Sequence, residues 1–408
     1  MKQDLTQGSI TRTLLWFALP MTVGNLLQQL YNIADTLIIG QFVGANALAA
    51  VGSSYTLMTF LTSILLGLSM GSGVAVSIAF GQKGWDRLKR GVFLSFSGIG
   101  LAAVALSSLA FLGIDEIMRL LQVPEEIYEL MRRYLLVIFT GIGGTFLYNY
   151  LACLLRAIGN SVTPLIFLGI SAVLNVVLDL LFVLSAGWGV AGAAFATVIA
   201  QWLSGIGLLL YTVRKAPELL PGRCHMKWNR EEATGIFRLS MITSVQQSIM
   251  NFGILMVQGL VNSFGATTMA AFAAAVKIDT FAYLPVQDFG NAYSTFVAQN
   301  YGVKDYGRIQ KGTKEAFAIS IVFSIIISIL VCTFAASLME IFVKAQETAV
   351  IACGVQYLRI EGSFYCGIGC LFLLYGYYRA INKAQMSVVL TVISLGCVLC
   401  WPISFRCR

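Results

Sequence analysis

Apolar residues occur along the whole chain in long runs that are separated by short polar segments. A membrane-spanning helix needs about 20 consecutive, mainly apolar residues, and the runs are too long and lack the period-two alternation of spanning β-strands. The pattern therefore predicts an all-α integral membrane protein with eleven transmembrane helices. We expect these helices near residues 13–40, 47–80, 92–113, 130–156, 161–184, 190–213, 236–262, 268–299, 313–338, 349–380 and 385–404.

The first half of the chain recurs in the second half. Three segments match in the same order at nearly one offset, which chance rarely produces. Because both halves start on the same side of the membrane, we expect two parallel six-helix-type lobes related by a pseudo-two-fold axis along the membrane normal. The matching pairs are FVGANALAA (42–50) with SFGATTMAA (263–271), GQKGWDRLKRG (81–91) with GVKDYGRIQKG (302–312), and RAIGN (156–160) with RAINK (379–383).

The repeat also predicts how the chain is divided. We expect an N-terminal lobe at 1–213, a polar cytoplasmic linker at 214–238 and a C-terminal lobe at 239–408. A counterpart of the sixth helix would fall near residues 412–436, beyond Arg408. The expectation is thus a C-terminally truncated chain whose second lobe lacks the twelfth helix.

Composition and charge agree with a membrane protein. Of the 408 residues, 58% are hydrophobic and only 11% are charged, whereas a soluble domain has roughly 25% charged residues. The net charge of +8 comes from Lys and Arg in loops, mainly those after even-numbered helices. Cytoplasmic loops carry such an excess, so we expect a multi-pass protein with a cytoplasmic N-terminus and no nucleic-acid partner.

Two aspartates inside apolar runs are the main candidates for chemistry. A carboxylate within a bilayer is costly, and it is usually paired, protonated or bound to an ion. Asp35 and Asp179 lie at similar depths below the outer helix ends, as does Thr197, and Asn175 lies one turn from Asp179. These four residues form a predicted Na⁺ or proton site, with a bracing hydrogen-bonded pair as the alternative.

The first helix carries more polar residues on the face of Asp35. Asn25, Gln28 and Asn32 recur at spacings of three and four, which places them on one side of a helix. We expect this face to line a substrate cavity or contact a partner helix. Pro20 removes a backbone hydrogen bond and so permits a helix-1 bend, either a moving one or a static kink.

The second lobe offers further cavity candidates, since it also has charged residues in apolar runs. Lys277 and Asp279 do not share a helix face because they are two residues apart. Acidic groups here would attract a cationic substrate, or Lys277 would neutralise one of them. The candidates are Gln247, Asn251, Lys277, Asp279, Asp288 and Glu361.

The chain resembles multidrug and toxic compound extrusion (MATE) transporters, and within them the DinF-type bacterial branch. The resemblance covers residues 10–404. It rests on ALP with Pro20, YNIADTLIIGQFVG around Asp35, NVVLD (175–179), and the loop motifs GQKGWDRLKRG (81–91) and RAIGN (156–160). In that branch the residues matching Asp35, Asn175, Asp179 and Thr197 form the cation or proton site, and the residue matching Pro20 marks the helix bend.

The resemblance implies a function without enzymatic chemistry. It implies a monomeric antiporter of the bacterial inner membrane that exports amphiphilic, often cationic small molecules in exchange for H⁺ or Na⁺, with no cofactor. A lipid-linked oligosaccharide flippase of the same superfamily is the nearest alternative, but the first lobe has no buried Lys or Arg for a pyrophosphate. A membrane-embedded prenyl transferase would need a DDxxD-like motif, which the sequence lacks. A non-transporting membrane protein is the third alternative.

Overall fold

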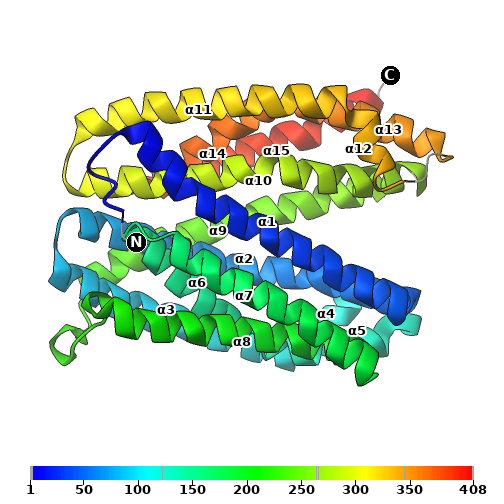
Figure 1. Cartoon of the computed structure of the whole chain (residues 1–408), viewed down its shortest axis with the longest axis horizontal. Helices are drawn as coiled ribbons and strands as arrows, with labels where there is room; N and C mark the ends of the chain where they lie inside the picture. Colours follow the sequence, from blue (N-terminus) through cyan, green and yellow to red (C-terminus); the bar gives the residue numbers. More distant parts are fainter. Residues whose placement is uncertain (1–2, 122, 263, 265, 344–345, 407–408) are drawn as a thin grey trace. The chain divides into compact units, whose positions relative to one another are not determined.

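The computed structural model of the chain describes residues 3–121, 123–262, 264, 266–343 and 346–406 (Figure 1), and these residues contain helices and no strands. The helices are α1 (Ile10–Phe42), α2 (Ala45–Gly81), α3 (Trp85–Leu112), α4 (Ile114–Leu120), α5 (Glu125–Phe139), α6 (Ile142–Ala157), α7 (Val162–Asp179), η1 (Leu180–Ser185), α8 (Gly189–Lys215), η2 (Pro217–Leu219), η3 (Arg223–His225), α9 (Arg230–Asn262), α10 (Ala266–Gly302), α11 (Tyr306–Thr333), α12 (Ala335–Glu340), α13 (Thr348–Ser363), α14 (Tyr365–Ala380) and α15 (Ala384–Arg406).

Every predicted transmembrane run corresponds to a helix or to two consecutive helices, so the all-α fold class is confirmed. Within the described residues, six single helices and two bent pairs are long and apolar enough to cross a membrane. The prediction of continuous helices over 130–156 and 349–380 is wrong. The first is split into α5 and α6, bent by 46°, and the second into α13 and α14, bent by 50°.

Both bends have a local cause that does not involve proline. At the first bend, the amides of Thr140 and Gly141 donate to the carbonyls three residues earlier instead of four. The carbonyl of Thr140 accepts instead from Nε1 of Trp202 on α8, at 3.0 Å. At the second bend, the amide of Phe364 donates to the carbonyl of Glu361, again three residues earlier. Tightened turns of this kind end one helix and start the next.

The internal repeat predicted from sequence is present in the backbone. Lys83 and Lys304, which occupy the same position in two matching segments, both have a positive φ, 55° and 63°. Gly159 and Asn382 are matched in the same way and have φ values of 84° and 59°. The short helices α4 and α12, which the apolar pattern did not predict, begin at repeat-related positions as well. Two lobes built from one helix order are thus confirmed.

The chain forms two compact units. Unit 1 comprises Met1–Gln3 and Val23–Ser248, and unit 2 comprises Asp4–Thr22 and Ile249–Arg408. The chain therefore passes from one unit to the other between Gln3 and Asp4, inside α1 and inside α9. The polar segment between α8 and α9, where the sequence predicted the linker between lobes, lies within unit 1.

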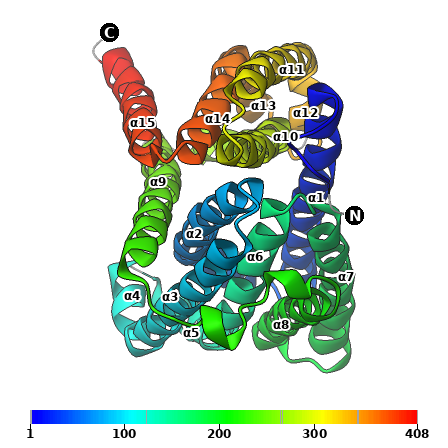
Figure 2. The same ribbon diagram turned by 90° about the vertical axis from the view of Figure 1, so that its left-hand side faces the viewer.

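In unit 1, α2 packs against α3, α5 and α6, and α8 packs against α5, α6 and α7; these helices are seen nearly end-on in Figure 2. The first half of α9 joins this bundle through close backbone approach. A Cβ atom added at Gly67 or Gly71 of α2 would lie 2.4 or 2.5 Å from the Cα of Ser244 or Ser240. Small residues four apart on each helix permit this contact.

In unit 2, α10 packs against α11, α13 and α14 (Figure 1). The N-terminal segment is fixed to this bundle by polar contacts. The Arg308 guanidinium donates to the carbonyls of Gly8 and Gln7, at 2.9 and 2.8 Å, and Thr11 donates to the carboxylate of Glu315 at 2.6 Å. These contacts explain why the first part of α1 belongs to unit 2.

Candidate functional site

The candidate site in unit 1 is built by the second half of α1, the end of α7 and α8. Asp179 is the last residue of α7, and the π-helical turn η1 follows it directly. Single π-helical turns are rare and frequently lie at functional sites. Asn175, one turn earlier, donates from Nδ2 to Oγ1 of Thr197 on α8 at 3.3 Å. The structure thus connects Asn175 and Thr197, with Asp179 one turn from Asn175 on α7 and Asp35 on α1 as the fourth predicted residue.

In this site Asp179 is buried, Asp35 is partly buried, and both carboxylates have buried oxygens without a partner among the described residues. The Asn175 and Asp179 residues are 2% and 0% exposed. Both carboxylate oxygens of Asp179, Oδ1 of Asp35 and Oδ1 of Asn175 have no hydrogen-bond partner within the described residues. The two carboxylates are close enough to interact electrostatically. An unpaired buried charge is so costly that such a pair normally holds a proton or a cation.

Two tyrosines also belong to this site, and sequence reasoning missed them. Tyr134 on α5 is 7% exposed and lies within electrostatic range of both Asp35 and Asp179. Tyr31 lies within the same range of Asp35. Its position one turn before Asp35 could have indicated it, whereas the sequence around Tyr134 contains no corresponding signal.

The other predicted residues of α1 have individual surroundings. Gln28 is exposed and hydrogen-bonds the side chain of Tyr31. The carbonyl of Asn32 accepts from the Thr36 hydroxyl at 2.7 Å, and Asn25 is partly buried. Pro20 lies inside a continuous α1, on the part of the helix that belongs to unit 2, three residues before the chain enters unit 1 at Val23.

A second acidic cluster lies in unit 2. Asp279 on α10 accepts hydrogen bonds from Tyr365 on α14 and Tyr357 on α13. Glu361 lies within electrostatic range of Asp279. The ammonium group of Lys277 lies 6.0 Å from the ring centroid of Phe342. Among the ion pairs of the described residues, none joins Lys277 to Asp279 or Glu361.

The remaining candidates are divided between the two units. Gln247, 7% exposed, places Nε2 3.7 Å from Sδ of Met70 in unit 1. Asn251, one turn further along α9, belongs to unit 2, as does Asp288, which is 2% exposed. The described residues contain no group of three or more His, Cys, Asp or Glu side chains that could hold a metal ion. The predicted unit 1 site has only two carboxylates, and these with an amide and a hydroxyl are oxygen-bearing groups of the kind that can bind a proton or Na⁺.

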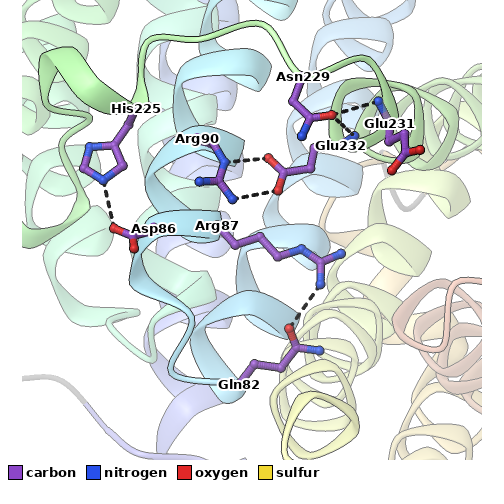
Figure 3. A network of polar contacts seen from close by, with 8 residues as sticks. All are labelled: Gln82, Asp86, Arg87, Arg90, His225, Asn229, Glu231 and Glu232. Carbon is purple, nitrogen blue, oxygen red and sulfur yellow. Dashed lines mark hydrogen bonds and ion pairs between the residues drawn. The ribbon is translucent and has the colours of Figure 1, made fainter.

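Charged groups at the helix ends are paired, in contrast to those of the site. Near the start of α5, Arg132 Nε lies 2.9 Å from Asp115 Oδ1, and the arginine holds the pKa of the Asp115 carboxyl below its usual value. Figure 3 shows the other network, around the polar segment of unit 1. There Nε2 of His225 lies 3.0 Å from Oδ1 of Asp86, and Arg90 binds both oxygens of Glu232 at 2.9 Å.

Comparisons with known proteins identify the family of this chain. The MatE family model matches residues 20–181 and 240–403, one stretch in each half of the repeat. The "Probable multidrug resistance protein YpnP" of Bacillus subtilis (strain 168) is 31% identical over 403 residues, which cover 98% of this chain and 88% of that protein.

The chain belongs to the MatE family.

Another MatE relative is the "Probable multidrug resistance protein NorM" of Thermotoga maritima, 25% identical over 95% of this chain and 83% of that protein. Among solved structures, the fold is similar to that of a multidrug resistance MATE family transporter of the MOP superfamily in an outward-facing conformation. The TM-score is 0.89 at 20% identity, with 95% of this chain and 86% of that chain covered. The MatE protein is therefore a multi-pass membrane protein with the two-lobe MATE fold.

Proposed function

We propose that this MatE protein is a secondary active antiporter of a bacterial inner membrane. It exports amphiphilic, often cationic compounds in exchange for H⁺ or Na⁺, and it acts as a monomer with a cytoplasmic N-terminus. Relatives described as multidrug resistance and multidrug export proteins support the substrate class. Basic residues in the loops after the even-numbered helices of the eleven predicted from sequence support the orientation.

The observation that carries the proposal is the unsatisfied carboxylate pair Asp35 and Asp179. In our proposal a proton or Na⁺ binds there, with Asn175 and Thr197 as further oxygen ligands, and neutralises the buried charge. The site then alternates between a charged and a neutral state. Only a differential interaction of this kind can shift a transporter between two conformations.

Alternating access needs places where the chain can flex between its compact units. In our proposal these are the two helices that belong to both units, α1 beside Pro20 and α9 between Ser248 and Ile249. A proline weakens the backbone hydrogen bonding of a helix and makes bending easier. Loading of Asp35, which follows Pro20 by about four turns on the same helix, would change the conformation of α1.

The test is efflux of ethidium from cells that lack their own pumps and express Asp35→Asn or Asp179→Asn. We expect the initial rate to fall about tenfold or more, as a barrier increase of about 1.4 kcal/mol would cause. Asp115→Asn is the matched control, because this exposed carboxylate lies outside the site. A protonophore, or removal of external Na⁺, identifies the coupling ion. Unchanged efflux in both Asn variants would exclude the pair as the coupling site.

A further inference from the structure

A line of buried polar side chains runs through unit 2, apart from the site proposed in unit 1. On α10, Asp279 and Tyr293 are 5% and 0% exposed, and the helix between them rises by about 21 Å. Between these levels, α11 contributes Ser320 and Ser324, which are 2% and 1% exposed. Polar groups are therefore distributed over much of the thickness of a bilayer.

The two serines are among five hydroxyls that are buried without a hydrogen-bond partner in the described residues; the others are those of Thr145, Ser240 and Ser294. Buried serines in the helices generally donate to a carbonyl one turn earlier, as Ser95 does to Gly91 at 2.6 Å. The hydroxyls of Ser320 and Ser324 are instead buried without a hydrogen-bond partner among the described residues. A buried hydroxyl without a partner costs free energy, and a bound water is the usual remedy.

Both hydroxyls face α14 at Gly369. A Cβ atom added at Gly369 would lie 2.6 Å from Oγ of Ser320 and 2.9 Å from Oγ of Ser324, with Val286 of α10 at 3.1 Å. One turn before Gly369 on the same helix is Tyr365, whose hydroxyl donates to Asp279. The serine pair is therefore adjacent to the buried carboxylate cluster.

Tyr293 forms the other end of the line. Its hydroxyl lies 2.6 Å from Oγ1 of Thr313 on α11. Because the Thr313 hydroxyl donates to the carbonyl of Ile309 at 2.8 Å, Tyr293 is the donor to Thr313. The phenol oxygen of Tyr293 therefore keeps lone pairs that can accept from a water molecule.

The internal repeat provides a comparison within the same chain, because the corresponding positions of unit 1 are mostly apolar. These counterparts pack in or against its main apolar core, which shows that the fold does not require polar residues there. Tyr293 is the exception in this line, because its counterpart Ser72 is polar. The other pairs, aligned by the matching segments of the sequence, are Asp279 with Met58, Ser320 with Ile99, Ser324 with Ala103, Thr313 with Val92, Tyr365 with Ile142 and Gly369 with Phe146.

We propose that water occupies this line in unit 2 and that a proton passes along it between Tyr293 and the Asp279 carboxylate. Each hydroxyl accepts a proton from one neighbour while it gives its own proton to the next, so the hydroxyls are unchanged and the transferred proton ends on the Asp279 carboxylate. The line is distinct from the Asp35–Asp179 site. Only the use of this proton in export rests on the proposed antiport function, whereas water access does not.

The competing explanation is that Ser320, Ser324 and Gly369 are merely small residues at a close helix contact, which is common in membranes. Silver ions distinguish a hydrated line from a dry helix contact, because they are small hydrophilic cations that react with cysteine. In membrane vesicles we would measure Ag⁺ modification of Ser320→Cys and Ser324→Cys, resolved by peptide mass spectrometry. Ile99→Cys and Ala103→Cys are the matched controls at the repeat-related positions of unit 1.

We expect both serine-derived cysteines to react about tenfold faster or more than their controls, because an apolar interior strongly excludes a cation. Equal rates in the two units would overturn the proposal. Radiolytic hydroxyl-radical labelling of the unmodified protein gives a second test if a cysteine variant misfolds. Val286 should be oxidised well above Leu65, its aliphatic repeat counterpart in unit 1. Uniformly low oxidation would likewise contradict bound water.

Neither measurement depends on transport. Loss of efflux in Asp35→Asn would therefore leave the water line intact, and slow Ag⁺ labelling would leave the antiport proposal intact. A third measurement joins them: the double variant Ser320→Ala with Ser324→Ala should slow proton-coupled ethidium export if the line supplies the proton. Export at the wild-type rate would restrict the line to hydration and refute its role in proton transfer.

Discussion

Individual carboxylates in this chain differ in their environment. Those at the helix ends, such as Asp115 and Glu232, lie beside an arginine that stabilises their charge. Asp179 is fully buried, and neither of its oxygens has a hydrogen-bond partner in the described part of the chain. The residue type is similar in all these cases, so the different chemistry expected of them comes from burial and partners alone.

Glu232 allows a pH-dependent prediction. The Arg90 guanidinium binds both of its oxygens and holds the pKa of the Glu232 carboxyl below its ordinary value. A carboxyl with a lowered pKa stabilises the folded state at pH values above its unfolded pKa, about 4.3, and loses this effect as the pH falls through the folded value. We expect Glu232→Gln to lower stability by about 1 kcal/mol near pH 7.

The measurement is thermal unfolding in detergent as a function of pH. The difference between Glu232→Gln and wild type should be largest near neutral pH and should shrink below about pH 4, where the carboxyl becomes protonated. Glu231→Gln is the matched control, because the neighbouring Glu231 engages Asn229 only through its backbone amide. A difference that persists unchanged into acid would show that the ion pair is not its cause.

Among the helices, α2 and the first half of α9 make the contact that is most sensitive to size. A Cβ at Gly67 would meet backbone atoms of Ser244, and backbone cannot move aside as a flexible side chain can. We therefore expect Gly67→Ala to destabilise unit 1 by about 1–3 kcal/mol, a typical cost of overpacking. Melting temperature and recovery of monodisperse protein would measure this effect.

Gly52 gives the control on the same helix. An added Cβ there has no atom within 4 Å. Since alanine favours a helix over glycine by about 1 kcal/mol, Gly52→Ala should be neutral or stabilising. Equal losses in both variants would mean that glycine itself, and not the close approach of α9, is what α2 requires.

The sequence predicted which segments are helical better than it predicted their interruptions. Long apolar runs located all the spanning helices because length and hydropathy are additive properties of a segment. The bends at Thr140 and Phe364 depend on a few hydrogen bonds, including the one from Trp202 of another helix. The π-helical turn after Asp179 likewise has no apolar pattern of its own, since its residues continue the run of α7.

At the scale of the whole molecule, some features could be predicted from the sequence and others could not. The offset between the matching sequence segments recurs in backbone torsions and in the starts of helices, so the repeat was fully predictable. Helix spacing and topology predicted that Asp35, Asn175, Asp179 and Thr197 lie at one level, and in the structure Asn175 contacts Thr197. Tyr134 was not predicted, because its proximity to both carboxylates depends on how α5 packs in the bundle. The sequence also did not predict that the first part of α1 belongs to unit 2 and the first half of α9 to unit 1, because hydropathy does not encode which bundle a helix contacts.

The division of α1 and α9 between the two units leads to a prediction for the polar segment between α8 and α9. If this segment alone connected the lobes, cutting it would let them separate. Instead, the first part of α1 is bound in unit 2 through Thr11 and the segment before it, and the first half of α9 is bound in unit 1 through Glu232 and Ser244. A protease site inserted between Pro221 and Gly222 should thus leave two fragments that remain associated.

The measurement is affinity purification of the cleaved protein in mild detergent through a tag on one fragment. We expect the untagged fragment to copurify in equal amount and ethidium efflux to persist after cleavage in cells. Addition of Gly67→Ala to the cleaved protein should weaken the association, because it removes the close α2–α9 contact that keeps half of α9 in unit 1. Complete separation of the fragments without that substitution would mean that the covalent segment, and not the shared helices, holds the molecule together.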